Sequence, residues 1–295
     1  MKKTHGLNKQ WEGYAFLLPW ILGFIIFTAI PMIMSFYYSF TQYDMFTQPK
    51  WVGLQNFRDI FNDPRAIKSL QVTFTYVGLG IPLQIFIALL VALALNRGLK
   101  GIRVYRAIYY LPSLLGGSVA IAILWRQLFN KEGLFNQFLA IFGIEGKNWI
   151  ASPDTALYTL IILLVWQFGA PMVIFLSGLK QIPPEYYEAA RIDGAGKTQI
   201  FLHITLPLLS PIIFFNLVMG IISAFQAFTP AYIISGGTGS PLDSTLFYTL
   251  YIYIKGFQHF SMGYASALAW LLLIIISIIT IIMFIFQRFW VHYEE

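Results

Sequence analysis

The chain reads Glu188-Ala189-Ala190-Arg191-Ile192-Asp193-Gly194-Ala195, and then Ile204-Thr205-Leu206-Pro207, between two long apolar runs. This short polar stretch stands in a chain that is 58% hydrophobic and only 11% charged. A soluble domain usually has about a quarter of its residues charged. The composition therefore excludes a soluble globular fold and predicts a membrane-spanning protein, with this stretch as a polar connection at one membrane surface.

Six long segments contain no Asp, Glu, Lys or Arg. They lie between Glu12 and Asp44, Lys68 and Arg97, Arg106 and Arg126, Asp154 and Lys180, Lys197 and Asp243, and Lys255 and Arg288. A helix needs about 20 apolar residues to cross the hydrocarbon core; five segments exceed that length and the third is borderline. They predict an all-α polytopic membrane protein with six transmembrane helices, over about 14–40, 71–96, 105–128, 156–179, 207–234 and 263–288.

The distribution of basic residues predicts the orientation of these helices. Lys2, Lys3 and Lys9 precede the first helix, and Arg97, Lys100, Arg103 and Arg106 crowd the short loop between the second and third. By the positive-inside rule, both segments are cytoplasmic. Residues 1–13 then form a cytoplasmic tail before a single membrane domain over 14–295, and the loop over 180–206 and the C-terminus are cytoplasmic as well. The first helix is too long for a cleaved signal peptide and is expected to be retained.

Several classes of function are excluded by what the sequence lacks. Zero cysteines exclude thiolate metal sites, and none of the four histidines lies deep in an apolar run. No metal site and no cofactor are expected on this chain. The net charge of +6 sits at membrane edges without a basic patch interleaved with aromatics, so no nucleic-acid partner is expected. No nucleophile motif or Gly-rich phosphate-binding loop occurs, so the chain is not expected to be an enzyme.

The polar loop has strong local signals for two short helices. Pro184 is suited to open a helix, and Glu185 and Glu188 fall in its first turns, where the helix dipole favours negative charge. Gly194 follows as a left-handed C-terminal cap. Residues 197–203 can form a second short helix before Pro207 opens the fifth membrane helix. We expect a rigid helical elbow parallel to the membrane.

The spacing resembles a known signature. Glu-Ala-Ala, three residues, Gly, nine residues, Ile, one residue and Leu-Pro is the loop of permease subunits in binding-protein-dependent ABC importers. Segments 182–187 and 262–267 are also similar to that family. Segments 51–57 and 234–237 favour its carbohydrate branch, in particular the maltose-permease-like half.

The resemblance implies a set of partners and a location. Such a subunit pairs with a second permease, expected here to be a different chain, and with two ATP-binding subunits, which carry the ATP and Mg²⁺. An extracellular sugar-binding protein, lipid-anchored or periplasmic, delivers the cargo. The location is the cytoplasmic membrane of a bacterium or archaeon, where the chain also contacts membrane lipid.

The resemblance also assigns a role to the elbow. Its ATPase-coupling residues would be Glu185, Glu188, Ala189, Ala190, Asp193, Gly194 and Ala195. The alternative is that the loop is a plain amphipathic linker on the inner surface.

Candidate substrate-pathway residues lie on the fifth and fourth helices. Polar side chains inside a membrane usually face a cavity or a neighbouring helix, and sugars bind through amide hydrogen bonds and flat aromatic faces. The candidates are Asn216, Gly220, Ser223, Phe225, Gln226 and Phe228, with Trp166 and Gln167 as a second aromatic–amide pair. Helix–helix packing is the alternative explanation for the same residues.

The predicted function is ATP-driven import of a sugar, such as a di- or oligosaccharide, by alternating access. Glycerol-phosphate or another polyol-like solute is the alternative cargo within the same family. An ion-coupled secondary transporter is a weaker alternative, because coupling to ions normally needs buried ionisable residues within the spans, and the span centres here have none.

Overall fold

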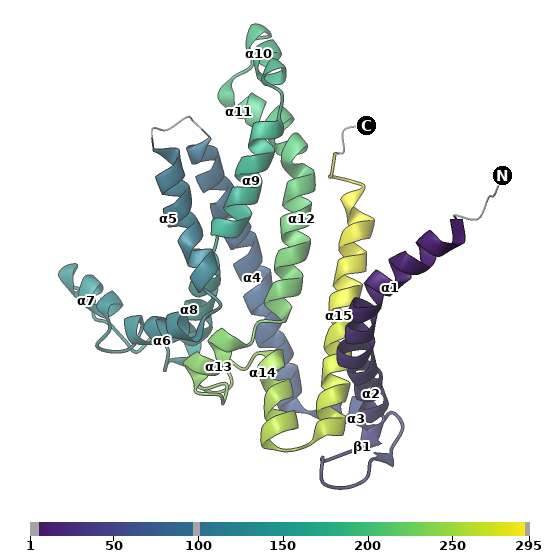
Figure 1. The fold of residues 1–295 in the computed structure, drawn as a ribbon. Coiled ribbons are helices and arrows are strands. Elements are labelled where there is room, and N and C mark those ends of the chain that lie inside the picture. Colours follow the sequence, from purple (N-terminus) through teal and green to yellow (C-terminus); the bar gives the residue numbers. More distant parts are fainter. Residues whose placement is uncertain (1–5, 97–100, 293–295) are drawn as a thin grey trace, which may run out of the picture. The chain divides into compact units, whose positions relative to one another are not determined.

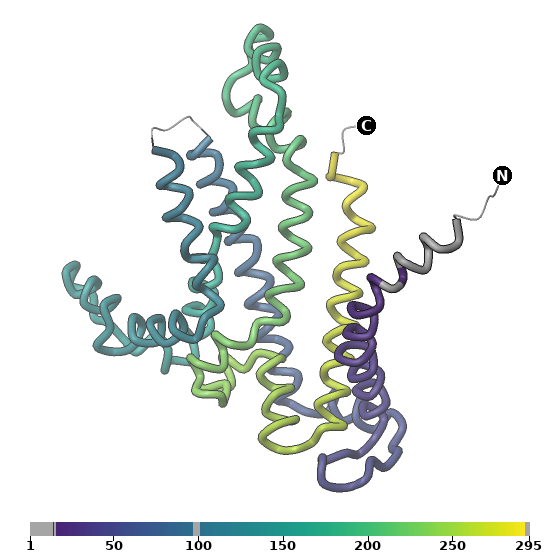
Figure 2. The backbone as a smooth tube through the Cα atoms, in the orientation of Figure 1, coloured from purple at the N-terminus to yellow at the C-terminus, as the bar shows by residue number. Residues whose placement is uncertain are grey.

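The computed structural model describes residues 6–96 and 101–292 (Figures 1 and 2). Lys2, Lys3, Arg97 and Lys100, used above for the orientation, lie outside these residues. The helices are α1 (Gly6–Phe24), α2 (Ile30–Ser39), α3 (Gln55–Asn62), α4 (Pro64–Leu95), α5 (Ile102–Leu115), α6 (Val119–Leu128), α7 (Leu134–Ile141), α8 (Pro153–Trp166), α9 (Gly169–Gln181), α10 (Pro184–Ile192), α11 (Lys197–Ile200), α12 (Leu206–Phe225), α13 (Thr229–Ser235), α14 (Tyr248–Tyr253) and α15 (Met262–Gln287). Short π-helical segments are η1 (Ile25–Ala29), η2 (Phe201–Thr205) and η3 (Ile254–Gln258).

The predicted all-α membrane fold is confirmed. Helical spans over Phe16–Ser39, Pro64–Leu95, Pro153–Gln181, Lys197–Phe225 and Met262–Gln287 are long and apolar enough to cross a membrane. α5 and α6 meet the same criterion as a pair, which gives up to six spans. Strand structure in the described part of the chain is limited to a short antiparallel pair, β1 (Thr41–Gln42) and β2 (Lys50–Trp51).

Three of the expected helices are broken. The helix expected over 105–128 is two helices, α5 and α6, bent by 99°. The helix expected over 156–179 is interrupted between α8, which ends at Trp166, and α9, which begins at Gly169, and the helix expected over 207–234 stops at Phe225 before α13 begins at Thr229. The breaks fall at Gly116–Gly117, at Gln167–Phe168 and at Gln226–Phe228. These breaks were not predicted, because a helix can end within an apolar run without any charged residue.

The chain divides into two compact units. The N-terminal unit comprises the described residues up to 62 together with 255–271, and the main unit comprises 63–254 and the described residues from 272 onward. In the N-terminal unit, Asn56 donates hydrogen bonds from Nδ2 to the carbonyls of Ser39 and Thr41, each at 2.9 Å. Gly263 is required beside them, because a Cβ at that position would lie 2.0 Å from the Thr41 carbonyl oxygen.

The main unit is built around α4. The helices α8, α9 and α12 pack against α4, which contributes buried Ala66, Ala88 and Ala92 with no exposed surface. The C-terminal part of α15 packs on α12, where the rings of Phe214 and Phe284 meet edge to face with centroids 5.1 Å apart. α10 and α11 lie at one end of this unit and α13 and α14 toward the other (Figure 1).

Candidate functional site

The loop over 180–206 forms a helical elbow, which we define as residues 183–205. α10 begins at Pro184 with Glu185 in its first turn. Gly194 adopts a left-handed backbone conformation with φ of +79°. The Ala195 N–H donates to the Ala190 carbonyl at 2.9 Å, which closes the end of α10 as a glycine cap does. These features follow from the local sequence.

The second half of the elbow differs from expectation. Helical structure runs without a break from Lys197 to Phe225, so Pro207 lies inside a helix and does not open one. The π-helical segment η2 directly precedes it, and a π-bulge lets a helix accommodate a local change in its hydrogen-bond ladder. The Tyr187 hydroxyl lies 3.4 Å from Thr205 Oγ1 and connects α10 to η2.

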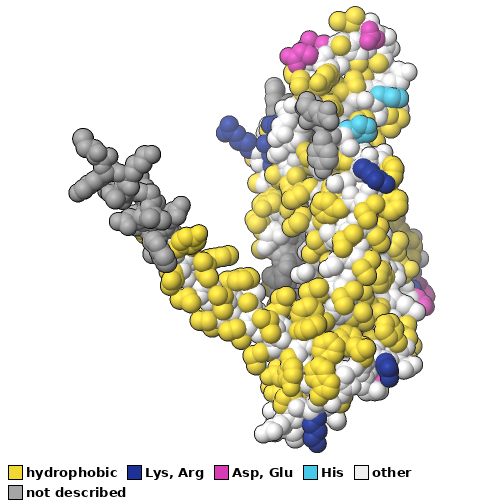
Figure 3. Space-filling model, turned by 90° about the vertical axis from the view of Figure 1, so that its right-hand side faces the viewer, with side chains coloured by type: hydrophobic (Ala, Val, Ile, Leu, Met, Phe, Trp, Pro, Cys, Tyr) yellow, Lys and Arg dark blue, Asp and Glu magenta, His cyan; other side chains and the backbone are white. Residues whose placement is uncertain are grey.

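The surface of the elbow presents most of the expected coupling residues. Glu185, Glu188, Ala189, Asp193 and Gly194 are exposed. Ala190 and Ala195 are half-buried and line a shallow hollow of about 410 Å³ together with Asp193, Gly194, Gln199, Ile200, His203 and Ile204. Figure 3 shows acidic and histidine side chains at this end of the main unit and hydrophobic side chains along the helices below it.

A cavity of about 490 Å³ lies in the main unit where the three helix breaks meet. It is lined by Tyr76, Ile81, Gln84, Ser113, Gly116, Gly117, Leu164, Gln167, Ala170, Pro171, Gly220, Ser223, Ala224, Gln226, Ala227, Phe228, Thr229 and Pro230. None of these described residues is charged. Non-helical backbone at membrane depth is tolerated where it is buried in protein or lines such a cavity.

Side chains from α4 and α5 satisfy the backbone groups that the break between α8 and α9 releases. Gln84 donates from Nε2 to the carbonyls of Leu164 and Gln167, at 2.9 and 3.0 Å. The Ser113 hydroxyl donates to the Gln167 carbonyl and accepts from the Ala170 N–H, each at 2.9 Å. A buried carbonyl without a partner costs about 1–3 kcal/mol, so these bonds hold the break, and with it the cavity, in place.

Gly116 is required for the close approach of α5 and Gln167. A Cβ at Gly116 would lie 2.0 Å from Cδ of the Gln167 side chain. The Gln167 amide donates from Nε2 to the Leu163 carbonyl at 3.1 Å. Packing therefore confines Gln167 at the wall of the cavity.

The structure brings together five of the eight predicted pathway residues. Gly220, Ser223, Gln226, Phe228 and Gln167 all line the cavity. Ser223 and Gln226 are exposed, so their polar atoms are available to a ligand.

The other three predicted pathway residues lie elsewhere. Asn216 is buried and donates from Nδ2 to the Ile212 carbonyl at 2.9 Å. Phe225 is 1% exposed and packs against Phe74. Trp166 faces Trp125, with ring centroids 5.7 Å apart. Gln84 and Ser113 also line the cavity and add polar groups to it. They were not predicted, because nothing in their local sequence marks them.

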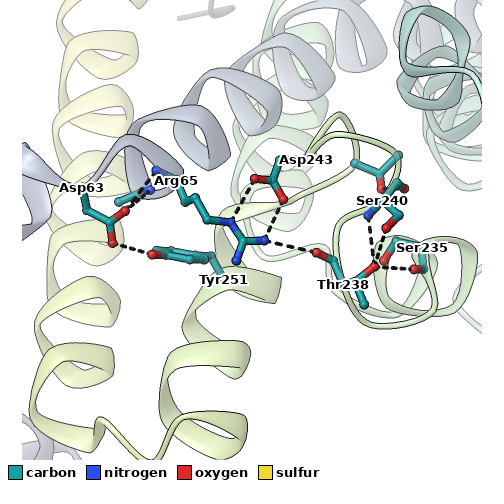
Figure 4. A network of polar contacts seen from close by, with 9 residues as sticks. Asp63, Arg65, Ser235, Thr238, Ser240, Asp243 and Tyr251 are labelled. Atoms are coloured by element: carbon teal, nitrogen blue, oxygen red, sulfur yellow. Dashed lines mark hydrogen bonds and ion pairs between the residues drawn. The ribbon is translucent and has the colours of Figure 1, made fainter.

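A polar network surrounds Arg65 (Figure 4), near α13 and α14, which lie toward the end of the main unit opposite the elbow (Figure 1). Arg65 binds both carboxylate oxygens of Asp243, at 2.9 Å from Nε and 2.6 Å from Nη2. Asp63 caps the start of α4 by accepting from the Arg65 N–H, and it also accepts from the Tyr251 hydroxyl. Burial and the bond to Asp63 raise the pKa of Tyr251 above its ordinary value. The network ties the start of α4 to the segment between α13 and α14.

Known proteins are similar to this chain in sequence and fold over almost its whole length. "Probable ABC transporter permease protein YesP" of Bacillus subtilis is 54% identical over 100% of this chain and 96% of its own length. "Arabinooligosaccharides transport system permease protein AraP" of the same organism is 33% identical over 93% of this chain and 88% of its own. A chain in the crystal structure of a bacterial ABC transporter that imports the acidic polysaccharide alginate is 25% identical, with a TM-score of 0.76, and the match covers 96% of each chain.

The family comparison agrees with these relatives. The family model described as "Binding-protein-dependent transport system inner membrane component" matches residues 61–291. The resemblance seen in the loop is thereby confirmed, and an ion-coupled secondary transporter is excluded. The chain belongs to this family of multi-pass permease components of bacterial ABC importers, in which ATP is bound and hydrolysed by a separate subunit.

Proposed function

We propose that this chain forms half of the membrane pathway of a carbohydrate importer and that the cavity between the helix breaks holds the sugar in transit. The observation that carries the proposal is the lining of that cavity. Exposed Gln226 and Ser223 offer amide and hydroxyl groups, Phe228 offers an aromatic ring, and the described lining contains no charged side chain. Amides, hydroxyls and aromatic faces match the hydroxyl and C–H surfaces of a sugar.

The cargo is a di- or oligosaccharide. The volume of about 490 Å³ is in the range of ordinary ligand sites, and a second permease would enlarge it. Two relatives are named for oligo- or polysaccharide transport. A glycerol-phosphate would require a cationic group beside its phosphate, and the described lining of this cavity provides none.

The elbow is the proposed attachment point for an ATP-binding subunit. Its exposed small and acidic residues surround a hollow into which a partner side chain can fit. The complex would contain a second, different permease, two ATP-binding subunits and an extracellular sugar-binding protein. The elbow, both termini and the start of α5, with Arg103, would then be cytoplasmic, and α13 and α14 would lie toward the outside.

Replacing Gln226 tests the cavity. We expect Gln226→Ala to reduce sugar uptake about 3–10-fold, because it removes one amide that hydrogen-bonds the sugar. The stimulation of ATP hydrolysis by loaded binding protein should be retained, since Gln226 is distant from the elbow. Uptake is measured as initial rates in proteoliposomes that contain the whole importer.

The matched control is Gln137→Ala, which removes an exposed amide on α7 that does not line this cavity. Uptake by that variant should equal wild type. Unchanged uptake by Gln226→Ala across all transported sugars would remove Gln226 from the pathway.

A further inference from the structure

A second cavity, of about 580 Å³, lies in the main unit at the end opposite the elbow. It opens between α6, the segment that precedes α8 and the turn that follows α13. Its lining residues are Ile123, Arg126, Gln127, Asn130, Asn148, Ile150, Ala151, Ile234, Ser235, Ser240 and Pro241. None of them lines the cavity that holds Gln226.

Most of the unused polar atoms in this second cavity are hydrogen-bond donors. Gln127 accepts at Oε1 from the Asn130 amide at 3.2 Å, which leaves its Nε2 for a ligand. Asn148 accepts at Oδ1 from the Ala151 N–H at 3.1 Å, which leaves its Nδ2. A lining rich in donors favours a ligand rich in acceptors.

Arg126 gives the cavity a positive charge. It is exposed, and no described carboxylate forms an ion pair with it. The described lining contains no acidic residue. A guanidinium binds an anionic oxygen group such as a carboxylate through two parallel hydrogen bonds, so the charge favours an anionic group among acceptor-rich ligands, and on a sugar acid that group is the carboxylate.

The wall that holds Ser235 and Ser240 is fixed in place (Figure 4). The Thr238 hydroxyl donates to the Ser235 carbonyl at 2.9 Å and lies 2.7 Å from Ser240 Oγ. Arg65 joins the same turn to α4 through Asp243. A site with a rigid wall loses little entropy when it binds a ligand.

From these contacts we infer that this second cavity binds a sugar unit that carries a carboxylate, with Arg126 on the carboxylate and Gln127 and Asn148 on the hydroxyls. The inference rests on the proposed function, because it makes this cavity an outer site on the path of the same cargo. An oligosaccharide with an acidic unit would place that unit here, and its neutral units would suit the uncharged cavity at the helix breaks.

The test measures direct binding of two trisaccharides to the purified importer in nanodiscs without binding protein. The probes are an alginate trisaccharide, which carries carboxylates, and neutral cellotriose. We expect Arg126→Gln to weaken binding of the alginate trisaccharide at least about 10-fold, the loss expected for a charge-assisted pair, and to leave cellotriose binding unchanged. Lys131→Gln is the matched control, because it removes a nearby positive charge that does not line the cavity, and it should change neither affinity.

Two results would overturn the inference. One is equal binding of the alginate trisaccharide to wild type and Arg126→Gln. The other is an equal loss of binding for the alginate trisaccharide and for cellotriose, which would show that Arg126 does not act on the carboxylate. Sugar uptake by Gln226→Ala, measured in proteoliposomes, reports on the cavity at the helix breaks alone, so failure of the outer site is distinguishable from failure of the proposed function.

Discussion

Gly194→Glu is expected to leave the importer assembled and inserted while its ATPase no longer responds to loaded binding protein. Gly194 has a φ of +79°, a conformation that costs a residue with a Cβ about 1–2 kcal/mol. The new carboxylate would also stand beside Asp193 on the exposed elbow. Strain and charge together would displace the surface that an ATP-binding subunit must fit.

The expected loss is at least about 10-fold in stimulated ATP hydrolysis, equivalent to about 1.4 kcal/mol of coupling free energy. The measurement compares ATP hydrolysis with and without loaded binding protein in proteoliposomes. Sugar uptake should fall in parallel. Co-purification of the ATP-binding subunit at the wild-type ratio checks that the importer is still assembled, so that the loss lies in transmission of the signal.

Gly194→Asn is the control that separates backbone strain from charge. Asparagine tolerates the left-handed conformation, and a Cβ at position 194 meets no atom of the chain within 4 Å. We expect this variant to retain most of the stimulation. Normal transport by Gly194→Glu would contradict the assignment of the elbow to coupling.

The elbow could be predicted because its signals are local. Pro184 and Gly194 act on their own turns of backbone, through a fixed φ and a permitted positive φ. The helix that passes through Pro207 could not be predicted in the same way, because a π-helical segment in front of a proline has no compositional sign. Apolar length therefore predicts that the membrane helices exist. Where each helix begins or ends depends on changes in its hydrogen-bond pattern, which leave no mark in the sequence.

The cavity was only partly predictable because it is made by contacts between distant segments. Gln84 and Ser113 line it because they satisfy backbone groups of Gln167 and its neighbours, and nothing in their local sequence indicates that. The Asn216 amide, by contrast, bonds to the carbonyl four residues earlier in its own helix. A side-chain amide that is bonded to its own helix in this way is not available to a ligand, and only a structure reveals such a bond.

One of the three helix breaks, the one between α5 and α6, has a signal in its local sequence. Gly116, Gly117 and Ser118 form a pair of flexible residues followed by a helix N-cap, and the Ser118 hydroxyl does accept from the Ile121 N–H. The breaks at Gln167 and Gln226 have no such signal, since glutamine is compatible with a helix. Tertiary contacts therefore decide where those two helices end.

Gly169→Ala is expected to destabilise the main unit by about 1–3 kcal/mol, the usual cost of forcing extra volume into a packed site. A Cβ at Gly169 would lie 2.2 Å from the Tyr109 carbonyl oxygen and 2.7 Å from the Tyr110 Cα. Both are backbone atoms of α5, so no side-chain rotation relieves the clash. α5 must move away from α9, although alanine itself is the better helix former.

The movement would also damage the transport cavity, because Ser113 on α5 bonds to Gln167 and Ala170 across this contact. We therefore expect Gly169→Ala to lower both the thermal stability of the purified importer, followed by size-exclusion chromatography after heating, and sugar uptake. Gly178→Ala on the same helix is the matched control. Its Cβ would meet mainly the terminal methyl of Ile212, at 1.9 Å, and that flexible group can rotate aside, so the loss should be clearly smaller. Equal stability of Gly169→Ala and wild type would show that α5 does not pack on α9 as closely as these distances require.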